Sequence, residues 1–466
     1  MIKKSRKIFS FVLVICLLCG SMSMVAGAIG ITNFFLLGDV NNDGAVTADD
    51  ARLTLRYVVY LEDDEDIIRL CGEDYEYQFA MDANRDGKLD SGDARMILRM
   101  SVGLEGNKSS YSYNKSAVDA ICKQYSAYGV QAAVIRDGKV IDTYSYGVAD
   151  KQTGRAVRDI TKFRASSLSK LVTFATCMAL VDRGVLDLDE DIGTYFGFSV
   201  RNPSYPNDKI TLRMLMTHSS TITGGSSFNA SLESGSTYPI RTLLNDSGNY
   251  NLYDKPGEVS EYSNFGAALV GCICELATGR CFEDLAQQYI IDPLGLDAGF
   301  VSTSLKSKEY AKIYSGGSEM WGDYYFNNVR YSSVLGQTVH ITQGNLLINT
   351  SDYAKVLCML LNGGVAEDGT RVLSQWAVNE MLCDQYVNGY EVVGFATYII
   401  PSLYEGMTHY THTGSSYGFH GAYAMDQDYK NGVVVFTSGC ARSLDESTYI
   451  YNVCQAIIYE LMPEFE

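Results

Sequence analysis

Ser167 and Lys170 are the first residues in the chain whose types and spacing suggest chemistry. They open a long apolar run that we predict to be a helix from about 167 to 182, where their side chains lie one turn apart on one face. The run is apolar nearly all round, which indicates a helix buried in a large domain. Burial lowers the pKa of a lysine amine, so Lys170 can hold or relay the proton that the Ser167 hydroxyl must lose to become a nucleophile. This S-x-x-K pattern alone is weak evidence, because two unconnected polar residues on a surface helix produce it equally well.

Two later stretches supply the partners that such a serine and lysine need. In the first, the Tyr262 hydroxyl can relay a proton to a leaving group, and the Asn264 amide can orient the lysine and hold a substrate carbonyl. In the second, a predicted strand ends in His412, Thr413, Gly414 and Ser415. An edge strand there can bind a substrate backbone, and the Ser415 amide can form an oxyanion hole with the amide of the nucleophile. Each stretch alone is ordinary loop or core sequence, so the prediction depends on all three meeting in one pocket.

The elements around these stretches predict one sheet whose strands come from both ends of the domain. A first helix starts near Ser116, and residues 129–148 alternate about Asp137-Gly138, a strong hairpin signal. Late strands are predicted at 392–400, 408–413, 422–425 and 432–437, followed by an amphipathic helix at 450–461. Helices and loops fill the middle, including an apolar helix at 267–276, so the sheet should carry a helical insertion.

Taken together and in this order, these stretches closely resemble the serine β-lactamase and penicillin-recognising family. The likeness covers about 340 residues and is nearest to the class C-like branch, which also contains D-alanyl-D-alanine carboxypeptidases, D-aminopeptidases and esterases. The matching stretches are 163–170, 215–219, 256–264, 361–364 and 412–414. The resemblance implies an α/β (α+β) fold for residues 116–462, with a β-lactamase-like antiparallel sheet flanked by helices and a helical subdomain.

The resemblance also implies a role for each matching residue. Ser167 is the acylated nucleophile and Lys170 its base or proton partner, and the family leaves open whether Lys170 or Tyr262 takes the proton. Asn264 orients the lysine, and His218 is expected to be structural. The substrate-binding residues are Asn264, His412, Thr413, Gly414 and Ser415. No cofactor is expected for catalysis, and no glutamate of the class A type that activates the deacylating water is identifiable.

His412 stands where class C β-lactamases carry the lysine of a K-T-G motif. A cation at that position binds a substrate carboxylate, and a neutral imidazole does so poorly near neutral pH. The difference disfavours β-lactam hydrolysis and favours peptidase or esterase work. We therefore expect a hydrolase for an ester or a D-amino-acid peptide bond in a small or cell-wall substrate. The alternatives are a true β-lactamase and a catalytically idle binding module.

Residues 36–105 contain two similar segments that are offset by 43 residues. Each reads D-x-N-x-D-G with a further acid at position 12, the pattern of a loop that surrounds calcium with oxygen ligands. The predicted ligands are Asp39, Asn41, Asp43, Ala45, Thr47 and Asp50 in the first loop and Asp82, Asn84, Asp86, Lys88, Asp90 and Asp93 in the second. A short helix is predicted after each loop, at 51–60 and 94–102. The duplication predicts two calcium ions.

The duplicated loops, each followed by A-R-x-x-L-R, resemble the type I dockerin, a small all-α calcium-binding module. This resemblance implies a cohesin module of a scaffoldin as partner, attachment to a cellulosome and a part in polysaccharide catabolism, for example by removal of plant-wall esters. The chain departs from the family in an acidic insert at 63–77. It also departs in loop positions ten and eleven, which are Ala48-Asp49 in one repeat and Ser91-Gly92 in the other, so the two binding faces need not be equivalent. A polar linker at 106–115 leads to the second domain.

The first residues and the composition indicate export. Residues 1–28 resemble a secretory signal peptide, with cations before an apolar stretch and Ala26-Gly27-Ala28 as the cleavage site. That stretch is too short for a comfortable membrane span, and no later segment is apolar enough for one. The formal charge of −18 argues against nonspecific nucleic-acid binding and against docking on anionic lipid. We expect a secreted, extracellular protein.

The chain has 12 cysteines, of which Cys16 and Cys19 lie in the signal segment. An exported protein can pair the others in disulfides. They lack the close regular spacing of a disulfide scaffold, however, and several sit in apolar helix-like runs. We expect mostly free, buried thiols.

Overall fold

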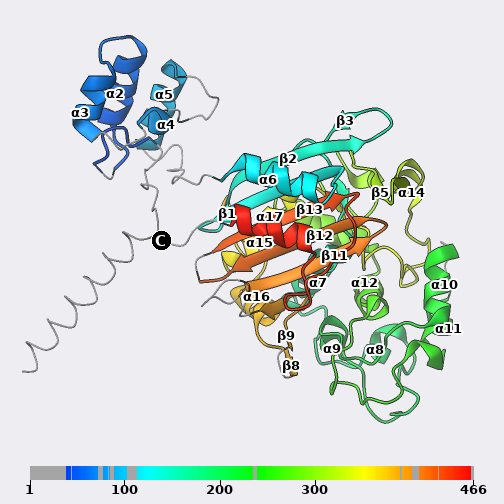
Figure 1. Cartoon of the computed structure of the whole chain (residues 1–466). Helices are drawn as coiled ribbons and strands as arrows, with labels where there is room; N and C mark the ends of the chain where they lie inside the picture. Colours follow the sequence, from blue (N-terminus) through cyan, green and yellow to red (C-terminus); the bar gives the residue numbers. More distant parts are fainter. Residues whose placement is uncertain are drawn as a thin grey trace, which may run out of the picture. The chain divides into compact units, whose positions relative to one another are not determined.

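The computed structural model describes residues 38–43, 45–71, 77–81, 83, 89–101, 113–234, 239–388, 391–400, 403, 409–428 and 430–462 (Figure 1). By its internal contacts the chain divides into two compact units, and the division falls between Ser112 and Tyr113. The predicted signal segment 1–28 and most of the predicted linker lie outside the described residues.

The first unit is a small helical body. Its helices in the described residues are α2 (Ala48–Val58), α3 (Asp64–Cys71), α4 (Tyr77–Met81) and α5 (Ser91–Ser101). α2 packs on α5, and Leu53, Ile67 and Ile97 belong to the apolar core. The Asp50 carboxylate accepts a hydrogen bond from the Thr47 amide at 2.8 Å, which caps the start of α2.

The acidic insert of this unit carries a helix that the sequence pattern did not indicate. α3 forms there because Ile67 and Cys71, one turn apart, are both buried, while its first turn is acidic and interacts favourably with the helix dipole. The two predicted helices are present, and each begins three residues earlier than expected, at Ala48 and Ser91.

The second unit is built on one antiparallel sheet. In the described residues this sheet has nine strands in the order β3-β2-β1-β13-β12-β11-β10-β9-β8. The strands are β1 Gly129–Arg136, β2 Lys139–Asp150, β3 Arg155–Ala156, β8 Tyr386–Asn388, β9 Glu391–Val393, β10 Tyr398–Ile400, β11 His409–Ser416, β12 Phe419–Asp426 and β13 Asn431–Ser438. β1 from the start of the unit pairs with β13 from its end, which confirms a sheet built from both ends with a helical insertion.

Two short strand pairs lie outside this sheet: β4 (Phe163–Arg164) with β7 (Leu347–Ile348), and β5 (Ile313–Ser315) with β6 (Ser318–Trp321). The predicted hairpin at 129–148 is confirmed, because Asp137 and Gly138 have φ values of 51° and 70°, as a two-residue turn between β1 and β2 requires. The prediction of a single strand at 392–400 is wrong. The chain folds back there between β9 and β10, where the Gly394 amide donates to the Thr397 carbonyl at 2.9 Å.

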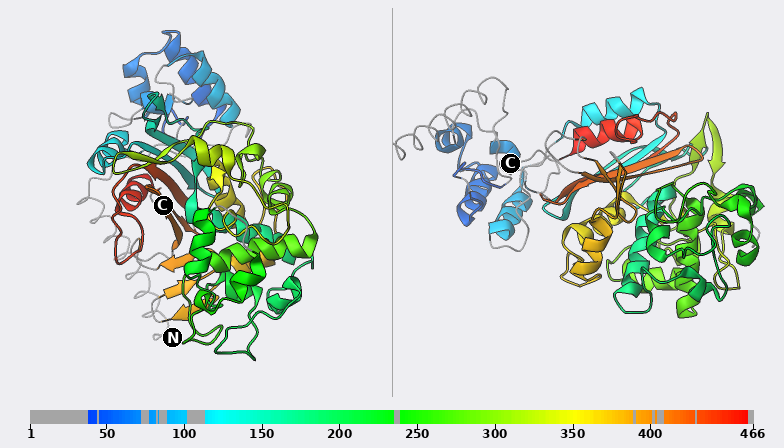
Figure 2. Two further views of the ribbon diagram at one scale, coloured as in Figure 1. Left: turned by 90° about the vertical axis from the view of Figure 1, so that its right-hand side faces the viewer. Right: turned by 90° about the horizontal axis from the view of Figure 1, so that it is seen from below.

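Helices cover both faces of the sheet (Figure 2). α6 (Lys115–Gln124) and α17 (Asn452–Leu461) pack together on one face, with α17 against β12 and β13. On the other face α15 (Thr350–Leu361) packs on β1, β2 and β13. The remaining α-helices are α7 Ser169–Val181, α8 Ile192–Phe196, α9 Leu212–Met216, α10 Ser226–Ser234, α11 Ile240–Leu244, α12 Asn264–Thr278, α13 Phe282–Ala286, α14 Asp323–Asn328 and α16 Gln375–Leu382. Single turns of 3-10 or π helix lie at η1 Ser166–Leu168, η2 Ser247–Asn249, η3 Gln287–Ile291 and η4 Ser302–Ser304.

α7 is buried from Ser169 to Leu180, as predicted for the helix that follows the candidate nucleophile. The cysteines of the described residues are free thiols and most are buried, which confirms the prediction for that part of the chain. Within the described residues no single helix has the length and apolarity to cross a membrane; α12 and Phe282–Ile291 meet that test only as a pair bent by 87°.

Candidate active site and calcium loops

The candidate nucleophile lies in a tight turn just before α7. Ser167 is the middle residue of the 3-10 turn η1, and the helix begins at Ser169, so the helix predicted at 167–182 starts slightly later than expected. Ser166 has a φ of +52°, in the left-handed region that residues other than glycine rarely adopt. Such strain persists only where the surrounding contacts fix the backbone.

Contacts from the segment around residue 346 and from α15 fix this turn. The Ser169 hydroxyl accepts a hydrogen bond from the Leu346 amide at 3.0 Å. The Tyr353 hydroxyl donates to the Leu168 carbonyl at 3.0 Å, and the Ala165 amide donates to the Leu346 carbonyl at 2.8 Å. Hydrogen bonds therefore hold both ends of the turn that presents the nucleophile.

The Lys170 amine is fully buried and directed at the candidate nucleophile. Its Nζ lies 3.2 Å from Ser167 Oγ. It also lies 2.8 Å from Asn264 Oδ1 and 2.8 Å from the Gln343 carbonyl oxygen. Burial, and next the positive charge of Arg164, hold the pKa of Lys170 well below its ordinary value. A neutral amine has two N–H groups and one lone pair, so it can donate along the two shorter contacts and accept the serine proton along the longer one.

Tyr262 reaches the same hydroxyl from another direction. Its phenolic O–H donates to Ser167 Oγ at 2.7 Å. Burial of the hydroxyl end raises the pKa of Tyr262 above its ordinary value, although 40% of the residue is exposed. The phenol therefore keeps its proton near neutral pH. Ser167 Oγ lies between a group that can accept a proton and a group that can donate one.

His218 holds the Tyr262 segment in place. Its Nδ1 accepts a hydrogen bond from the Ser263 amide at 3.2 Å, and its carbonyl accepts from the Glu261 amide at 2.8 Å. The imidazole packs on the Tyr262 ring with 4.6 Å between the ring centroids. Ser263 in turn caps α12 by accepting from the Gly266 amide at 2.8 Å. These contacts agree with the structural role expected for His218.

β11 runs past the nucleophile with one edge open. β10 pairs with β11 only at His409 to Thr411, so in the described structure residues 412–416 have no partner strand on that side. A Cβ on Gly414 would come within 2.7 Å of the Ala165 carbonyl oxygen and 3.3 Å of the Leu168 nitrogen, so only glycine permits this approach. An extended substrate can add to the open edge by backbone hydrogen bonds.

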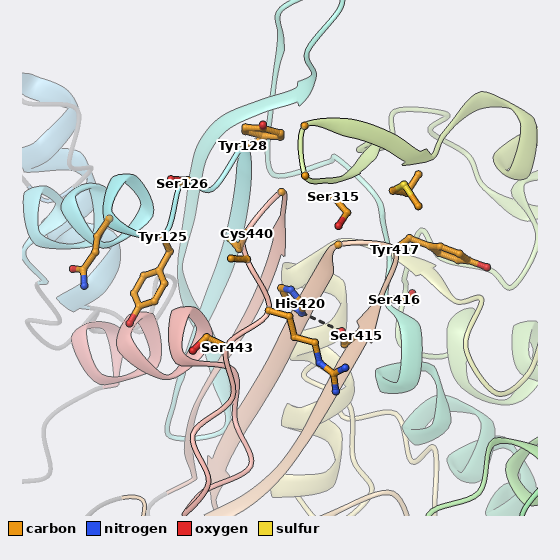
Figure 3. Close-up of a pocket in the computed structure, with 18 residues that line it drawn as sticks. Tyr125, Ser126, Tyr128, Ser315, Ser415, Ser416, Tyr417, His420, Cys440 and Ser443 are labelled. Atoms are coloured by element: carbon orange, nitrogen blue, oxygen red, sulfur yellow. Dashed lines mark hydrogen bonds between the residues drawn. The ribbon is translucent and has the colours of Figure 1, made fainter.

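Ser415 and Ser416 point to opposite faces of the sheet, as neighbours on a strand do. Ser415 Oγ lies 3.1 Å from His420 Nδ1 (Figure 3). The side chain is therefore engaged with His420, and the backbone groups of Ser415 remain to bind a substrate along the open edge of β11. The Ser166 hydroxyl donates to Ser416 Oγ at 3.0 Å. Ser416 therefore ties the strand to the nucleophile turn. The oxyanion hole expected from the Ser415 and Ser167 amides stays a prediction.

His412 is buried beside Tyr262 and Tyr398, with 6.2 and 5.6 Å between the ring centroids. Burial, and next the charge of Lys170, lower the pKa of His412 to about 3, so the imidazole is neutral. Its Nδ1 lies 2.7 Å from the Thr413 carbonyl oxygen. Because a carbonyl can only accept, Nδ1 carries the proton, and Nε2, which is buried and without a hydrogen-bond partner in the described residues, keeps its lone pair. The position offers an acceptor and no cation.

Two contacts of the site lie outside the residues that sequence reasoning assigned. Gln343 meets Lys170 through its backbone carbonyl, so its side-chain type carries no signal. Arg164, three residues before the nucleophile, donates to Ser416 Oγ at 2.6 Å and to Asn345 Oδ1 at 2.8 Å. The sequence signal for Arg164 was its position in the Phe-Arg-Ala-Ser stretch. Its positive charge helps to lower the pKa of Lys170.

The first predicted calcium loop contains buried acids. Asp50 is fully buried, and its carboxylate accepts the Val40 and Thr47 amides, both at 2.8 Å. Asp39 is 2% exposed and accepts the Asp43 amide at 3.1 Å. Buried carboxylates are costly unless a cation or hydrogen bonds compensate, so this oxygen-rich donor set fits calcium. Within the described residues no group of three acidic, imidazole or thiol side chains converges at metal-binding distance, and Asp43 is exposed.

In the second loop only Asp90 and Asp93 are described, and Asp82, Asn84, Asp86 and Lys88 lie outside the described residues. The Asp93 carboxylate accepts the Asp90 amide at 2.9 Å, as Asp50 accepts the Thr47 amide in the first loop. The two loops therefore end with the same hydrogen bond, from the amide at loop position 9 to the carboxylate at position 12.

Comparison with known families matches both units. Residues 114–451 match the family described as Beta-lactamase, and residues 37–100 match the Dockerin type I domain.

Individual proteins and solved structures are also similar to this chain. Penicillin-binding protein 4 of Amycolatopsis lactamdurans is 28% identical over 308 residues, which are 64% of this chain and 78% of that protein. Esterase EstB of Burkholderia gladioli is 27% identical over 216 residues, 43% of this chain and 53% of the esterase. The D-amino acid amidase of Ochrobactrum anthropi superposes with a TM-score of 0.57 at 22% identity, covering 74% of this chain and 96% of the amidase. The class C β-lactamase of Rhodobacter sphaeroides superposes with a TM-score of 0.56 at 18% identity, covering 74% and 97%. At these identities the structural likenesses show the fold alone.

Proposed function

This chain belongs to the β-lactamase family, and we propose that it is a serine hydrolase that acts through an acyl-enzyme on Ser167. Its substrate is an ester or a D-amino-acid peptide bond. One observation carries the proposal. Ser167 Oγ lies 3.2 Å from a desolvated lysine amine and 2.7 Å from a tyrosine hydroxyl, each held by its own contacts.

The proposed reaction begins when Ser167 Oγ attacks the substrate carbonyl carbon while its proton passes to Lys170 Nζ. Backbone amides of Ser167 and Ser415 stabilise the charge that develops on the carbonyl oxygen. As the bond to the leaving group breaks, Tyr262 gives that group a proton and regains one from the Lys170 ammonium. Water then attacks the acyl carbonyl, its proton passes to the same pair of residues, and Ser167 leaves with a proton as the acid is released.

The neutral His412 narrows the proposed substrate class. Its Nε2 lone pair can accept a hydrogen bond but cannot form an ion pair with a carboxylate next to the scissile bond. This favours esters and amides that have no carboxylate beside the scissile bond over penicillins. The similar proteins include one named Esterase EstB, which supports ester substrates.

A fluorophosphonate probe tests the proposed function directly. We expect one probe molecule per chain, bound to Ser167 in the peptide map of full-length, calcium-loaded protein, together with turnover of p-nitrophenyl acetate. The Ser167→Ala variant should show neither. Folded wild-type protein that forms no adduct on Ser167 would overturn the proposal.

Replacing His412 with lysine should create a site for substrate carboxylates. We expect acylation by penicillin to rise about tenfold or more, since a hydrogen bond to a charged group is worth about 1.5–3 kcal/mol, while turnover of an uncharged acetyl ester changes little. Bocillin labelling rates measure the effect. His412→Gln is the control, because it is neutral and of similar size; an equal gain in this variant would show that charge is not the cause.

The first unit is a type I dockerin domain, a kind of module that binds calcium and docks on cohesins. We propose that it binds two calcium ions through the twelve predicted ligands and attaches the hydrolase to a scaffoldin outside the cell. Support comes from the buried Asp39, Asp50 and Asp93 and from the repeated loop pattern. The signal-like segment at 1–28 supports export.

A further inference from the structure

A cavity of about 700 Å³ lies at the end of the sheet where β11 turns into β12 (Figure 3). Its walls come from residues 124–128 before β1, the β5–β6 hairpin, residues 415–418, His420 of β12, and residues 439–443 after β13. The proposed reaction gives none of these residues a role except Ser415.

The cavity begins where the open edge of β11 ends. Ser416 lines the cavity, and its hydroxyl also accepts the hydrogen bond from Ser166, the neighbour of the nucleophile. The next residue, Tyr417, lines the cavity as well, is 46% exposed and turns the chain with a φ of +58°. A substrate bound along residues 412–416 therefore continues toward this cavity.

The proposed chemistry decides which part of a substrate points this way. Tyr262, which protonates the leaving group, lies on the His412 side of the groove. In the proposed reaction the Ser167 and Ser415 amides hold the reacting carbonyl. The leaving group therefore lies toward His412, and the acyl group extends in the opposite direction, toward the cavity.

The charge of the cavity differs from that of the chain as a whole. The chain carries a formal charge of −18, yet Arg442 lines the cavity and no aspartate or glutamate does. Two further cations lie over tyrosine rings that line the cavity: Lys151 Nζ lies 3.9 Å from the centroid of the Tyr128 ring, and the Arg164 guanidinium lies 5.5 Å from that of Tyr417. Within the described structure none of these three cations has a carboxylate at ion-pair distance.

We propose that this cavity is the acyl-arm subsite of the enzyme and that it takes an acyl group ending in a carboxylate, which pairs with Arg442. The proposal rests on the serine-hydrolase function above. Serine and tyrosine hydroxyls along the walls, at Ser126, Ser315, Ser443 and Tyr125, can bond a polar arm on its way. The volume is that of a typical small-molecule site.

A series of esters tests the subsite on full-length, calcium-loaded protein. p-Nitrophenyl monoesters of dicarboxylic acids from succinate to sebacate are compared with their neutral counterparts, in which the far carboxylate is a methyl ester. At the arm length that reaches Arg442 we expect the charged ester to have a kcat/KM about tenfold higher, because hydrogen bonds to charged groups are among the stronger ones. The advantage should shrink as salt screens the pair.

Arg442→Gln should remove this advantage and leave p-nitrophenyl acetate turnover unchanged. Arg52→Gln is the matched control: it removes the same charge from an exposed arginine of the first unit and should keep the advantage. Normal acetate turnover without a charged-arm preference at any length would overturn the subsite.

A binding measurement distinguishes failure of the subsite proposal from failure of the proposed hydrolase function. Calorimetry with free sebacate needs no turnover: saturable binding that weakens about tenfold in Arg442→Gln supports the subsite, and no saturable binding overturns it. Loss of all ester turnover together with absence of an adduct on Ser167 would overturn the hydrolase function instead.

Discussion

Replacing Lys170 with methionine should lower kcat/KM for an ester substrate about a thousandfold or more, the usual size of a general-base contribution. Methionine nearly fills the same fully buried space, so packing around α7 is kept. What is lost is the nitrogen that lies 3.2 Å from Ser167 Oγ and can accept its proton. Steady-state turnover and the rate of fluorophosphonate labelling measure the change.

The pH dependence of activity tests whether the amine lost in Lys170→Met is the base that accepts the Ser167 proton. Burial keeps the pKa of Lys170 low, so the amine is neutral over a wide range, and wild-type activity should fall only as pH drops through that lowered pKa. The residual activity of Lys170→Met should lack this acidic limb. A limb that persists unchanged in the variant would assign the base to another residue.

The pH dependence of folding stability tests the low pKa of Lys170 independently of activity. Between the lowered pKa of Lys170 and the ordinary lysine value, the unfolded chain holds a proton at this residue that the folded chain does not, so wild-type stability rises with pH in that window. Lys170→Met should remove this rise and stabilise the fold below the ordinary lysine pKa.

Lys162→Met is the control for the stability reading. Lys162 is also buried, but its Nζ pairs with Asp297 at 3.3 Å and Asp352 at 3.7 Å. Its loss leaves Asp297 without this cation and leaves Asp352 with Lys355 alone, which lies at 2.9 Å, so it should destabilise the fold. If Lys170→Met lowers the melting temperature as Lys162→Met does, Lys170 is charged in the folded protein and the assignment as base is wrong.

The parts of this site that could be predicted are those with local signals. The S-x-x-K spacing placed Lys170 one turn from Ser167, and the apolar run after it predicted the burial that depresses the lysine pKa. Gly414 was assigned from the sequence as a substrate-binding residue, and the structure adds the reason for glycine there, the close approach of the Ala165 carbonyl. The pattern of strands at both ends of the domain was enough to predict the sheet.

Other features could not be predicted because they depend on long-range contacts. The third partner of Lys170 is a backbone carbonyl at Gln343, which any residue type would supply. The apolar residues at 392–400 read as one strand, and only the backbone bond between Gly394 and Thr397 shows the fold-back. Whether His412 carries a proton on Nδ1 depends on the Thr413 carbonyl beside it, which sequence does not reveal.

Removing calcium should unfold the first unit and leave the hydrolase active. Asp39, Asp50 and Asp93 are at most 2% exposed, and without a cation their carboxylates would lie buried in a small core that gains little from apolar burial alone. Because metal binding and folding are coupled in such modules, we expect excess chelator to expose residues 38–101 to rapid proteolysis. Readdition of calcium should restore protection, while p-nitrophenyl acetate turnover stays within twofold throughout.

Two aspartates of the first unit make the test specific to the loop. Asp39→Asn removes a predicted ligand charge and should shift the calcium midpoint for protection at least tenfold upward, since charge count sets affinity in such loops. Asp49→Asn, whose side chain is 72% exposed on α2 and is no predicted ligand, should not shift it. Because the chain divides into two units with their own cores, loss of esterase activity in step with proteolysis of residues 38–101 would contradict their independence. An equal calcium shift in both variants would show that net charge, not ligation by Asp39, governs the module.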